Sequence, residues 1–229
     1  MNDQRSNTVI TPEAMAKAID HTVLKPDAVP TDLEVLANEA ITHGFYAVCV
    51  NSCHVALVHK LLKESDVHVC TVVGFPLGAM HPKSKAFEAA TAIEEGASEV
   101  DMVLNIGALK SSEFKTVQED IQEVRQVVGS GRVLKVIIET CLLTDKEKVV
   151  ACKIADSAGT DFVKTSTGFS NGGATVEDVR LMKQSVGGSV QVKASGGVKD
   201  WDKAVAMIRA GASRIGTSSG VTILQHAPK

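Results

Sequence analysis

The sequence DFVKTSTG, residues 161–168, indicates a buried β-strand with a lysine inside it. Phe162, Val163 and the threonines that follow favour an extended strand, and Gly168 comes where such a strand should end. Burial disfavours the charged form of a lysine, so Lys164 must either pair with a carboxylate or have a lowered pKa. A lysine with a lowered pKa is the neutral amine that nucleophilic attack requires.

Seven other short apolar segments recur along the chain, separated by longer amphipathic segments. The eight expected strands cover residues 19–24, 47–51, 69–75, 100–106, 133–140, 162–167, 190–195 and 214–217. A glycine ends the amphipathic segment and precedes the next strand at Gly44, Gly96, Gly159 and Gly211, as expected for helix C-termini. This repeated unit of helix, glycine and strand predicts a parallel sheet with crossover helices.

Eight such units in 229 residues, with no linker or low-complexity stretch, predict a single domain that spans residues 1–229. The predicted fold is an α/β structure, a (β/α)8 TIM barrel with a short N-terminal helix, and a doubly wound open sheet is the alternative. Thr31 and Glu34, like Thr144 and Glu147, have the spacing of a capping box, so we expect a helix to begin at each place.

Composition narrows the classes of partner and compartment. The formal net charge is -3, from 24 basic and 27 acidic residues without a basic cluster, which argues against nucleic acid and anionic membranes as partners. Residues 1–11 are polar and lack the apolar core of a signal peptide or a transmembrane segment, so we expect a cytoplasmic protein.

The cysteines indicate reduced thiols rather than a disulfide framework, because the five of them are odd in number and lie mostly in apolar surroundings. The segment from Cys49 through Cys53 to His54 does not have the spacing of a common zinc site. We therefore expect neither a metal nor a cofactor.

Polar residues inside the expected strands share one face of each strand. Barrel strands covered by helices should be nearly all apolar, so these exceptions indicate a polar barrel interior. Within each strand the exceptions are an even number of residues apart, which places them on the same face. The pairs are Asp20 and Thr22, Asp101 and Asn105, Lys135 and Glu139, Lys164 and Ser166, and Lys193 and Ser195. His21 has the opposite parity, so we expect it to face the helices.

This polar interior has two interpretations. One is a buried ion-pair network that holds the barrel together, for example between Asp101 and either Lys135 or Glu139. The other is a reactive site, because Lys164 and Lys193 lie on adjacent strands and two ammonium groups repel each other. One of the two lysines would then be the neutral amine that attacks a carbonyl to form a Schiff base, and Asp101 could move protons with water. These residues alone do not decide which lysine attacks.

Two glycine-rich turns follow the last two expected strands, SGGV at residues 195–198 and GTSSG at residues 216–220. In TIM barrels the loops after strands seven and eight frequently bind phosphate. A glycine such as Gly216 lets backbone N–H groups approach an oxyanion, and the hydroxyls of Ser218 and Ser219 add further donors. The sequence thus predicts a phosphorylated carbonyl compound as the substrate.

Five segments together resemble deoxyribose-phosphate aldolase, in the order of that family: DHT at 20–22, EVDMVLN at 99–105, FVKTSTG at 162–168, VKASGG at 192–197 and GTSSG at 216–220. The resemblance implies reversible cleavage of 2-deoxy-D-ribose 5-phosphate to D-glyceraldehyde 3-phosphate and acetaldehyde, through a lysine Schiff base and without a metal. The implied partners are small molecules, a phosphorylated sugar and acetaldehyde. We also expect a homodimer, because many oligomers are symmetric pairs.

The resemblance also implies roles for individual residues. Lys164 would form the Schiff base, Lys193 would lower the pKa of Lys164, and Asp101 would relay protons. The implied substrate contacts are Gly168, Gly197, Gly216, Ser218 and Ser219 around the phosphate, and Thr167 and Asp20 at the hydroxyls. Two alternatives stay open: another class I sugar-phosphate aldolase or transaldolase, and a sugar-phosphate-binding barrel without catalysis.

Two features add expectations of their own. Some family members end in a flexible tail with a terminal tyrosine that is thought to assist proton transfer, whereas residues 225–229 are QHAPK and the single tyrosine is Tyr46. We therefore expect slower protonation of the enamine. Cys49 lies near the end of the second expected strand, where an aldehyde could reach it, although a buried core thiol is the simpler interpretation.

Overall fold

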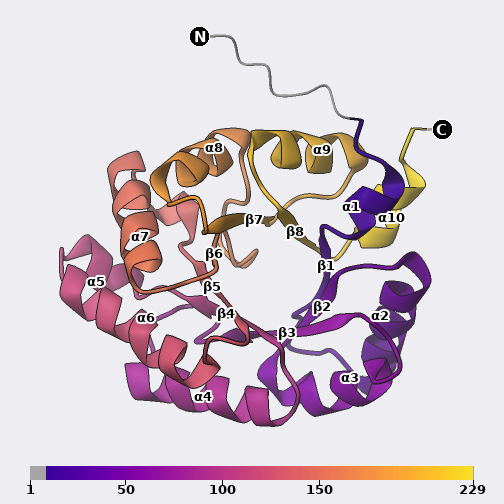
Figure 1. Cartoon of the computed structure of the whole chain (residues 1–229), viewed down its shortest axis with the longest axis horizontal. Helices are drawn as coiled ribbons and strands as arrows, with labels where there is room; N and C mark the ends of the chain where they lie inside the picture. Colours follow the sequence, from indigo (N-terminus) through magenta and orange to yellow (C-terminus); the bar gives the residue numbers. More distant parts are fainter. Residues whose placement is uncertain (1–8, 229) are drawn as a thin grey trace.

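A computed structural model describes residues 9–228, which form a closed barrel of parallel strands surrounded by helices (Figure 1). The strands are β1 (Ile19–Val23), β2 (Ala47–Val50), β3 (His68–Val73), β4 (Glu99–Val103), β5 (Val133–Ile137), β6 (Phe162–Lys164), β7 (Gln191–Ser195) and β8 (Arg214–Thr217). They follow one another around the barrel in chain order, and β8 pairs with β1. The predicted TIM barrel is confirmed, and the open sheet is wrong.

The helices lie outside the strands and connect them. They are α1 (Pro12–Ala16), α2 (Pro30–His43), α3 (Val55–Leu62), α4 (Pro82–Glu94), α5 (Ile106–Lys110), α6 (Phe114–Val128), α7 (Asp145–Ser157), α8 (Val176–Ser185), α9 (Trp201–Ala210) and α10 (Gly220–Gln225), with short 3-10 turns η1 (Ser52–His54) and η2 (Thr140–Leu142). Helix α1 is the expected N-terminal helix. Residues 1–8 of the polar segment 1–11, and Lys229, lie outside the described residues. Between residues 9 and 228, no helix combines the length and the apolar character that crossing a membrane requires.

One of the two expected capping boxes is confirmed. Thr144 caps α7, and its hydroxyl and backbone N–H both contact the Glu147 carboxylate. The other box is wrong, because α2 begins at Pro30 and the Asp32 carboxylate accepts a hydrogen bond of 2.9 Å from the N–H of Val29. Proline is well suited to the first turn of a helix, where its missing N–H is not needed.

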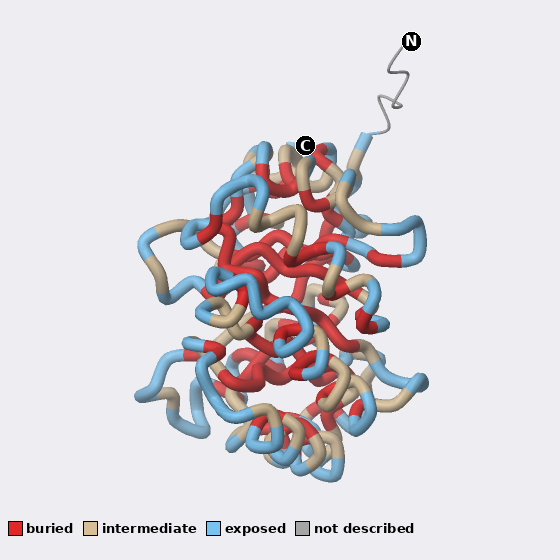
Figure 2. Tube along the Cα trace, turned by 90° about the vertical axis from the view of Figure 1, so that its left-hand side faces the viewer, coloured by how far each residue is buried: buried red, intermediate tan, exposed pale blue. Residues whose placement is uncertain are grey.

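The two faces of each strand differ as the parity of the sequence predicted. Val100, Met102 and Val136 are fully buried in the apolar core between strands and helices. His21 also faces outward, and its ring lies 2.7 Å from the Glu39 carboxylate on α2, as expected. Figure 2 shows the buried residues concentrated in the middle of the molecule and the exposed ones on the outer loops and helices. The opposite face of the strands is left for the polar residues.

Six of the eight expected strands end one to three residues earlier than their sequences indicate, and the ends of β4 and β5 matter most for the polar residues. Strand β4 stops at Val103, and the side chain of Asn105 instead caps α5 by accepting a 3.1 Å hydrogen bond from the N–H of Ala108. Strand β5 stops at Ile137, and Glu139 takes a left-handed backbone conformation with φ 54° before η2. Parity had placed Asn105 and Glu139 on the interior face of a strand, but both lie beyond the strand ends, as does Ser166 after β6.

Candidate active site

Asp101 lies at the centre of a buried charged cluster inside the barrel. Its Oδ2 accepts hydrogen bonds of 2.8 Å from Nζ of both Lys164 and Lys193, and its Oδ1 accepts one of 2.7 Å from Nζ of Lys135. All four side chains are buried. Parallel register brings them together, because Asp101 is the neighbour of Lys135 on β5 and Lys164 is the neighbour of Lys193 on β7.

Two further carboxylates extend the cluster toward β1 and β8. Asp20 accepts hydrogen bonds from Lys193 and, at 2.8 Å, from the Arg214 guanidinium. Glu99 accepts one of 2.6 Å from Lys135 and one of 3.3 Å from Arg214. The charged cluster consists of Asp20, Glu99, Asp101, Lys135, Lys164, Lys193 and Arg214.

Glu99 and Arg214 are cluster members that the sequence did not identify. Glu99 was detectable, because it lies two residues before Asp101 and therefore on the same face of β4. Arg214 opens β8, where a charged residue is usually exposed, yet its guanidinium stacks over the Tyr46 ring at 3.2 Å from the ring centre. Of the two pairings expected for Asp101, the one with Lys135 is present, whereas Glu139 bonds elsewhere.

Neighbouring cations keep the buried aspartates of the charged cluster ionised, although burial favours their neutral form. Burial alone would raise the pKa of Asp101, but the charges of Lys135, Lys164 and Lys193 outweigh it and hold that pKa well below its ordinary value. Burial would likewise raise the pKa of Asp20, and Lys193, Lys135 and Arg214 lower it to about 2. Both aspartates are therefore ionised at neutral pH.

The same balance changes the expectation for Lys193. Repulsion between Lys164 and Lys193 predicted that one of them would be neutral. Burial does favour the neutral form of Lys193, but Asp101 and Asp20 outweigh burial and raise its pKa. Lys193 is thus an ammonium. Because the charged cluster has four basic and three acidic members, one positive charge is left over when all of them are ionised.

A cavity of about 540 Å³ opens at the C-terminal ends of the strands, and Lys164 is the one member of the charged cluster that lines it. Lys193 and Asp101 lie beneath Lys164 and do not line the cavity. An aldehyde in the cavity would meet Lys164 before Lys193. This placement separates the two lysines, which the pattern of residues alone could not do.

Most of the expected substrate contacts line this cavity. Its lining includes Thr167, Gly168, Gly197, Gly216 and Ser218. Asp20 does not line it, because its carboxylate is bound to Lys193 and Arg214 inside the barrel. Ser219 does not line it either, and lies at the N-cap of α10. The sequence did not identify Lys25 and Lys199, which place two amines in the lining.

Glycine is required at two positions of this lining. Gly197 has φ 73°, a left-handed conformation that L side chains rarely adopt. At Gly216, an added Cβ would lie 2.2 Å from the Ser195 hydroxyl oxygen and 3.0 Å from Cε of Lys193. A side chain at residue 216 would therefore displace both the cavity wall and the charged cluster.

Thr167 is held by Glu139 at the edge of the cavity. The Thr167 hydroxyl and backbone N–H both donate to the Glu139 carboxylate, and the hydroxyl accepts a 3.1 Å hydrogen bond from the N–H of Phe169. The sequence had placed Glu139 with Lys135 and Asp101 instead. The difference arises because β5 ends two residues before Glu139.

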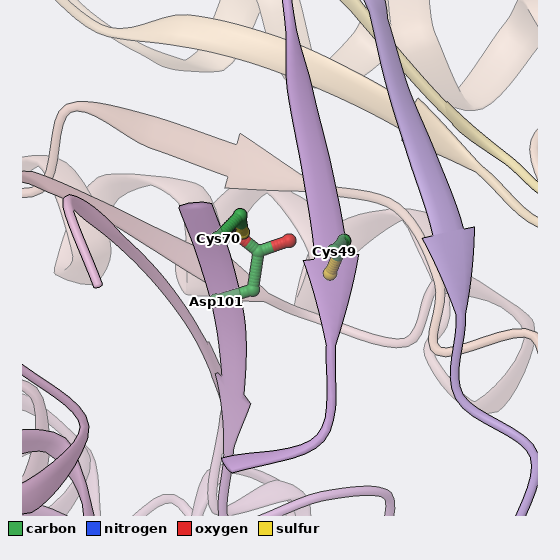
Figure 3. A group of neighbouring side chains, drawn as sticks. All are labelled: Cys49, Cys70 and Asp101. Atoms are coloured by element: carbon green, nitrogen blue, oxygen red, sulfur yellow. Dashed lines mark hydrogen bonds between the residues drawn. The ribbon is translucent and has the colours of Figure 1, made fainter. Parts of the chain in front are cut away.

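Cys49, Cys70 and Asp101 form a group whose ligand atoms lie within 4.8 Å of one another. Figure 3 shows these three side chains near one another among the strands. The group fits a metal ion poorly, because Asp101 already accepts hydrogen bonds from three lysines, of which Lys135 and Lys193 are charged and would repel a cation. Cys49 is fully buried and does not line the cavity, so the core-thiol interpretation describes it.

Comparison with known proteins agrees with this geometry. A sequence profile described as DeoC/LacD family aldolase matches residues 14–226. The deoxyribose-phosphate aldolase 1 of Bacillus licheniformis is 58% identical over 211 residues, which are 92% of this chain and 95% of that protein. The deoxyribose-phosphate aldolase of Finegoldia magna is 60% identical over 209 residues, which are 91% of this chain and 98% of that protein.

Solved structures show the same relationship. The tetrameric deoxyribose phosphate aldolase of Aeropyrum pernix matches with a TM-score of 0.88 at 34% identity, covering 94% of this chain and 91% of that one. The orotidine 5'-phosphate decarboxylase of Pyrococcus horikoshii matches with a TM-score of 0.62 at 15% identity, which shows a shared fold alone. Since the family profile spans nearly the whole described chain and close relatives are more than half identical, the chain belongs to the DeoC/LacD family of aldolases.

Proposed function

We propose that this aldolase cleaves 2-deoxy-D-ribose 5-phosphate reversibly to D-glyceraldehyde 3-phosphate and acetaldehyde, through a Schiff base on Lys164. The observation that carries the proposal is the position of Lys164, a buried lysine that bonds to Asp101 and also lines the cavity. The names of the relatives from Bacillus licheniformis and Finegoldia magna support the substrate.

Lys164 acts as the nucleophile in its neutral form. Its Nζ attacks C1 of the open-chain sugar, forming a C–N bond while the carbonyl π bond breaks and the oxygen takes up a proton from the solvent. Loss of water from this carbinolamine then gives a protonated imine. Asp101 accepts the proton from the attacking nitrogen and returns it to the departing hydroxyl through water. Lys193 stays charged and holds the Asp101 carboxylate in place from the other side.

The protonated imine then draws electrons from the sugar chain. The C2–C3 bond breaks, its electron pair forms the enamine C=C bond, and the C3 hydroxyl loses its proton as C3 becomes the aldehyde of glyceraldehyde 3-phosphate. The enamine takes a proton at C2, and water hydrolyses the resulting imine to release acetaldehyde and Lys164. Each proton that leaves in one step is required in a later one. The Asp101 carboxylate, which is hydrogen-bonded to Nζ of Lys164, is well placed to carry these protons.

The glycine-rich turns in the cavity lining suit the phosphate group. Gly197, Gly216 and Ser218 offer close backbone approach and a hydroxyl donor there, and Lys25 and Lys199 add positive charge. We also keep the homodimer as a proposal. It is testable by light scattering, and the relative from Aeropyrum pernix is a tetramer.

Borohydride trapping tests the proposal directly. The protein is incubated with acetaldehyde, reduced with borohydride and digested, and the adduct is located by mass spectrometry. We expect an ethyl group on Lys164. A Lys115→Met variant serves as the matched control, because Lys115 is a solvent-exposed lysine whose loss should leave trapping unchanged. An adduct confined to surface lysines, or none at all, would contradict the proposal.

The same sample separates the alternatives. Cleavage of 2-deoxyribose 5-phosphate with release of acetaldehyde distinguishes this reaction from that of an aldolase or transaldolase for longer sugars. A sugar-phosphate-binding barrel without catalysis would give neither the adduct nor cleavage. Cleavage that continues in the presence of a chelator would exclude dependence on a removable metal ion.

A further inference from the structure

Glu139 lies beside the cavity without being part of the charged cluster or of the cavity lining. Its two carboxylate oxygens each lie 3.3 Å from the backbone nitrogen of Thr167, and the Thr167 hydroxyl donates to one of them. Glu139 is 1% exposed, whereas Thr167 lines the cavity together with Lys164. A single hydrogen-bonded residue thus separates Glu139 from the reacting groups.

The backbone of Glu139 is also unusual. Its φ of 54° and ψ of 68° lie in the left-handed region, where among the described residues Ser112 is the only other non-glycine residue with positive φ. A glutamate adopts this conformation at an energetic cost, and such residues persist where the surrounding structure or the function requires them. The conformation is what turns the Glu139 side chain away from β5 and toward the loop after β6.

The hydrogen bonds of Thr167 leave it one free site. A hydroxyl has one donor and two acceptor positions. The Thr167 hydroxyl donates its proton to the Glu139 carboxylate, and one acceptor position receives the N–H of Phe169 at 3.1 Å. The remaining acceptor position has no partner among the described residues, and Thr167 lines the cavity. If Glu139 were absent, the hydroxyl could rotate and offer its proton to a ligand instead.

We propose that Glu139 is a positioning residue that fixes the Thr167 hydroxyl as a hydrogen-bond acceptor for a hydroxyl group of the substrate. The inference rests on the proposed function, because it takes the ligand to be a sugar phosphate that carries hydroxyls beyond its aldehyde carbon. An acceptor at this point favours a ligand that donates an O–H, and it disfavours one that presents a carbonyl oxygen there.

Glu139 is not needed to hold the two loops together. The loop after β5 is joined to the segment 164–165 by two backbone hydrogen bonds, from Ile138 to the carbonyl of Lys164 at 3.0 Å and from Thr140 to the carbonyl of Thr165 at 2.9 Å. These bonds do not involve the side chain of Glu139. Variants that change only this side chain should therefore fold with the barrel intact.

Comparing the sugar phosphate with acetaldehyde distinguishes a positioning role of Glu139 from a merely structural one. Acetaldehyde forms the same imine and enamine on Lys164 as the sugar but has no hydroxyl for Thr167 to accept from. In Glu139→Ala we expect kcat/KM for cleavage of 2-deoxyribose 5-phosphate to fall about tenfold to hundredfold, the effect of losing a hydrogen bond that a charged group supports. Deuterium exchange into the methyl group of acetaldehyde should stay within about twofold of the wild type.

A double-mutant cycle tests whether the two side chains act as one unit. Thr167→Val removes the hydroxyl and keeps the shape, and Glu139→Ala added to it should cost less than about threefold more, because there is no hydroxyl left to orient. Glu177→Gln, at an exposed glutamate on α8, is the matched control and should match the wild type in both assays. Multiplicative losses in the cycle would show that Glu139 acts independently of Thr167 and would overturn the inference.

Glu139→Gln keeps the test decisive if the alanine variant does not fold. Glutamine has the same size, but its amide group can donate to the Thr167 oxygen, so cleavage should fall while acetaldehyde exchange holds. Full cleavage activity in Glu139→Gln, or an equal fall in cleavage and in exchange, overturns the inference. Failure of the proposed function is a different result, since the wild type itself would then give no adduct on Lys164 and no cleavage.

Discussion

At the scale of single residues, Asp101 determines how the two lysines at the site differ. Its Oδ2 accepts from Lys164 and Lys193 at the same distance, but Lys193 has a second carboxylate partner in Asp20 and Lys164 does not. The second partner keeps Lys193 charged, whereas Lys164 shares its single carboxylate partner and also lines the cavity. The chemical difference between the lysines therefore originates in their neighbours.

Replacing Lys193 by methionine tests this arrangement. Asp101 would lose one of its ammonium partners, and its uncompensated charge would hold the proton of Lys164 more tightly. We expect the initial rate of ethyl-adduct formation on Lys164 at pH 7 to fall at least about tenfold, the effect of one pKa unit. Raising the pH should restore part of the rate. Trapping at the wild-type rate in a folded Lys193→Met protein would disprove the link between the two lysines.

At the scale of elements, another buried ion pair joins helices α4 and α6 outside the barrel strands. Lys85 Nζ donates to the Asp120 carboxylate at 2.6 Å and to the carbonyl of Val103, the last residue of β4, at 2.9 Å. Both side chains are fully buried. Burial lowers the pKa of Lys85 and raises that of Asp120, so the pair lies in surroundings that favour neither charge. Its effect is to fix the end of β4, two residues beyond Asp101.

Breaking this pair should destabilise the fold strongly. Lys85→Met leaves the Asp120 carboxylate buried without its cation, and we expect the free energy of unfolding to fall by about 3–5 kcal/mol in urea titrations. Adding Asp120→Leu should recover much of the loss, because an apolar pair needs no compensation. Lys83→Met, at an exposed position of the same helix, should change little. A Lys85→Met protein as stable as this control would show that the pair is unimportant.

The limits of prediction from the sequence also lie at the ends of elements. Alternating polarity correctly placed Asp101, Lys135, Lys164 and Lys193 inside the barrel, because the two-residue period of a strand depends on local geometry. The same period failed at Glu139, where the strand had already ended and a left-handed residue turned the side chain toward the next loop. Strand ends depend on tertiary contacts that periodicity does not encode.

The cavity lining likewise contains residues that the sequence predicted and residues that it did not. Its glycines and Ser218 were expected from the motifs, whereas Lys25 and Lys199 lie in loops without any periodic pattern and were not identified. Arg214 escaped notice because a charged first residue of a strand is normally exposed, and only the closure of the barrel buries it. Residues whose environment is created by distant parts of the chain are the ones that sequence reasoning missed.

At the scale of the whole molecule, the charged cluster links stability to pH. The pKa of Asp20 is lowered from 3.8 to about 2, mainly because Lys193, Lys135 and Arg214 outweigh its burial. A lowered pKa in the folded state contributes stability above the unfolded pKa, and this contribution is lost as the pH falls through the folded pKa. For Asp20 the window runs from about pH 4 down to about pH 2, and the contribution is about 2 kcal/mol.

Urea unfolding measured at a series of pH values checks this expectation. The wild type should lose stability steadily between about pH 4 and pH 2. Asp20→Asn cannot be protonated, so its stability, although lower at neutral pH, should depend less steeply on pH in this window. Equal slopes for the two proteins would show that Asp20 does not couple the cluster to acid unfolding.

The order of the strands along the chain has a consequence for synthesis. Asp20 lies on the first strand to leave the ribosome, and its partners Lys193 and Arg214 lie on the last two, 173 and 194 residues later. Contacts between such distant residues form slowly, since a long loop must close before they are made. Until β7 and β8 have emerged, the Asp20 carboxylate of the nascent chain lacks Lys193 and Arg214, the two cations that it bonds, and must stay hydrated. A truncated chain that ends before β7 would therefore leave Asp20 in contact with water, whereas the completed barrel buries it. Completion of the chain is then the step that excludes water.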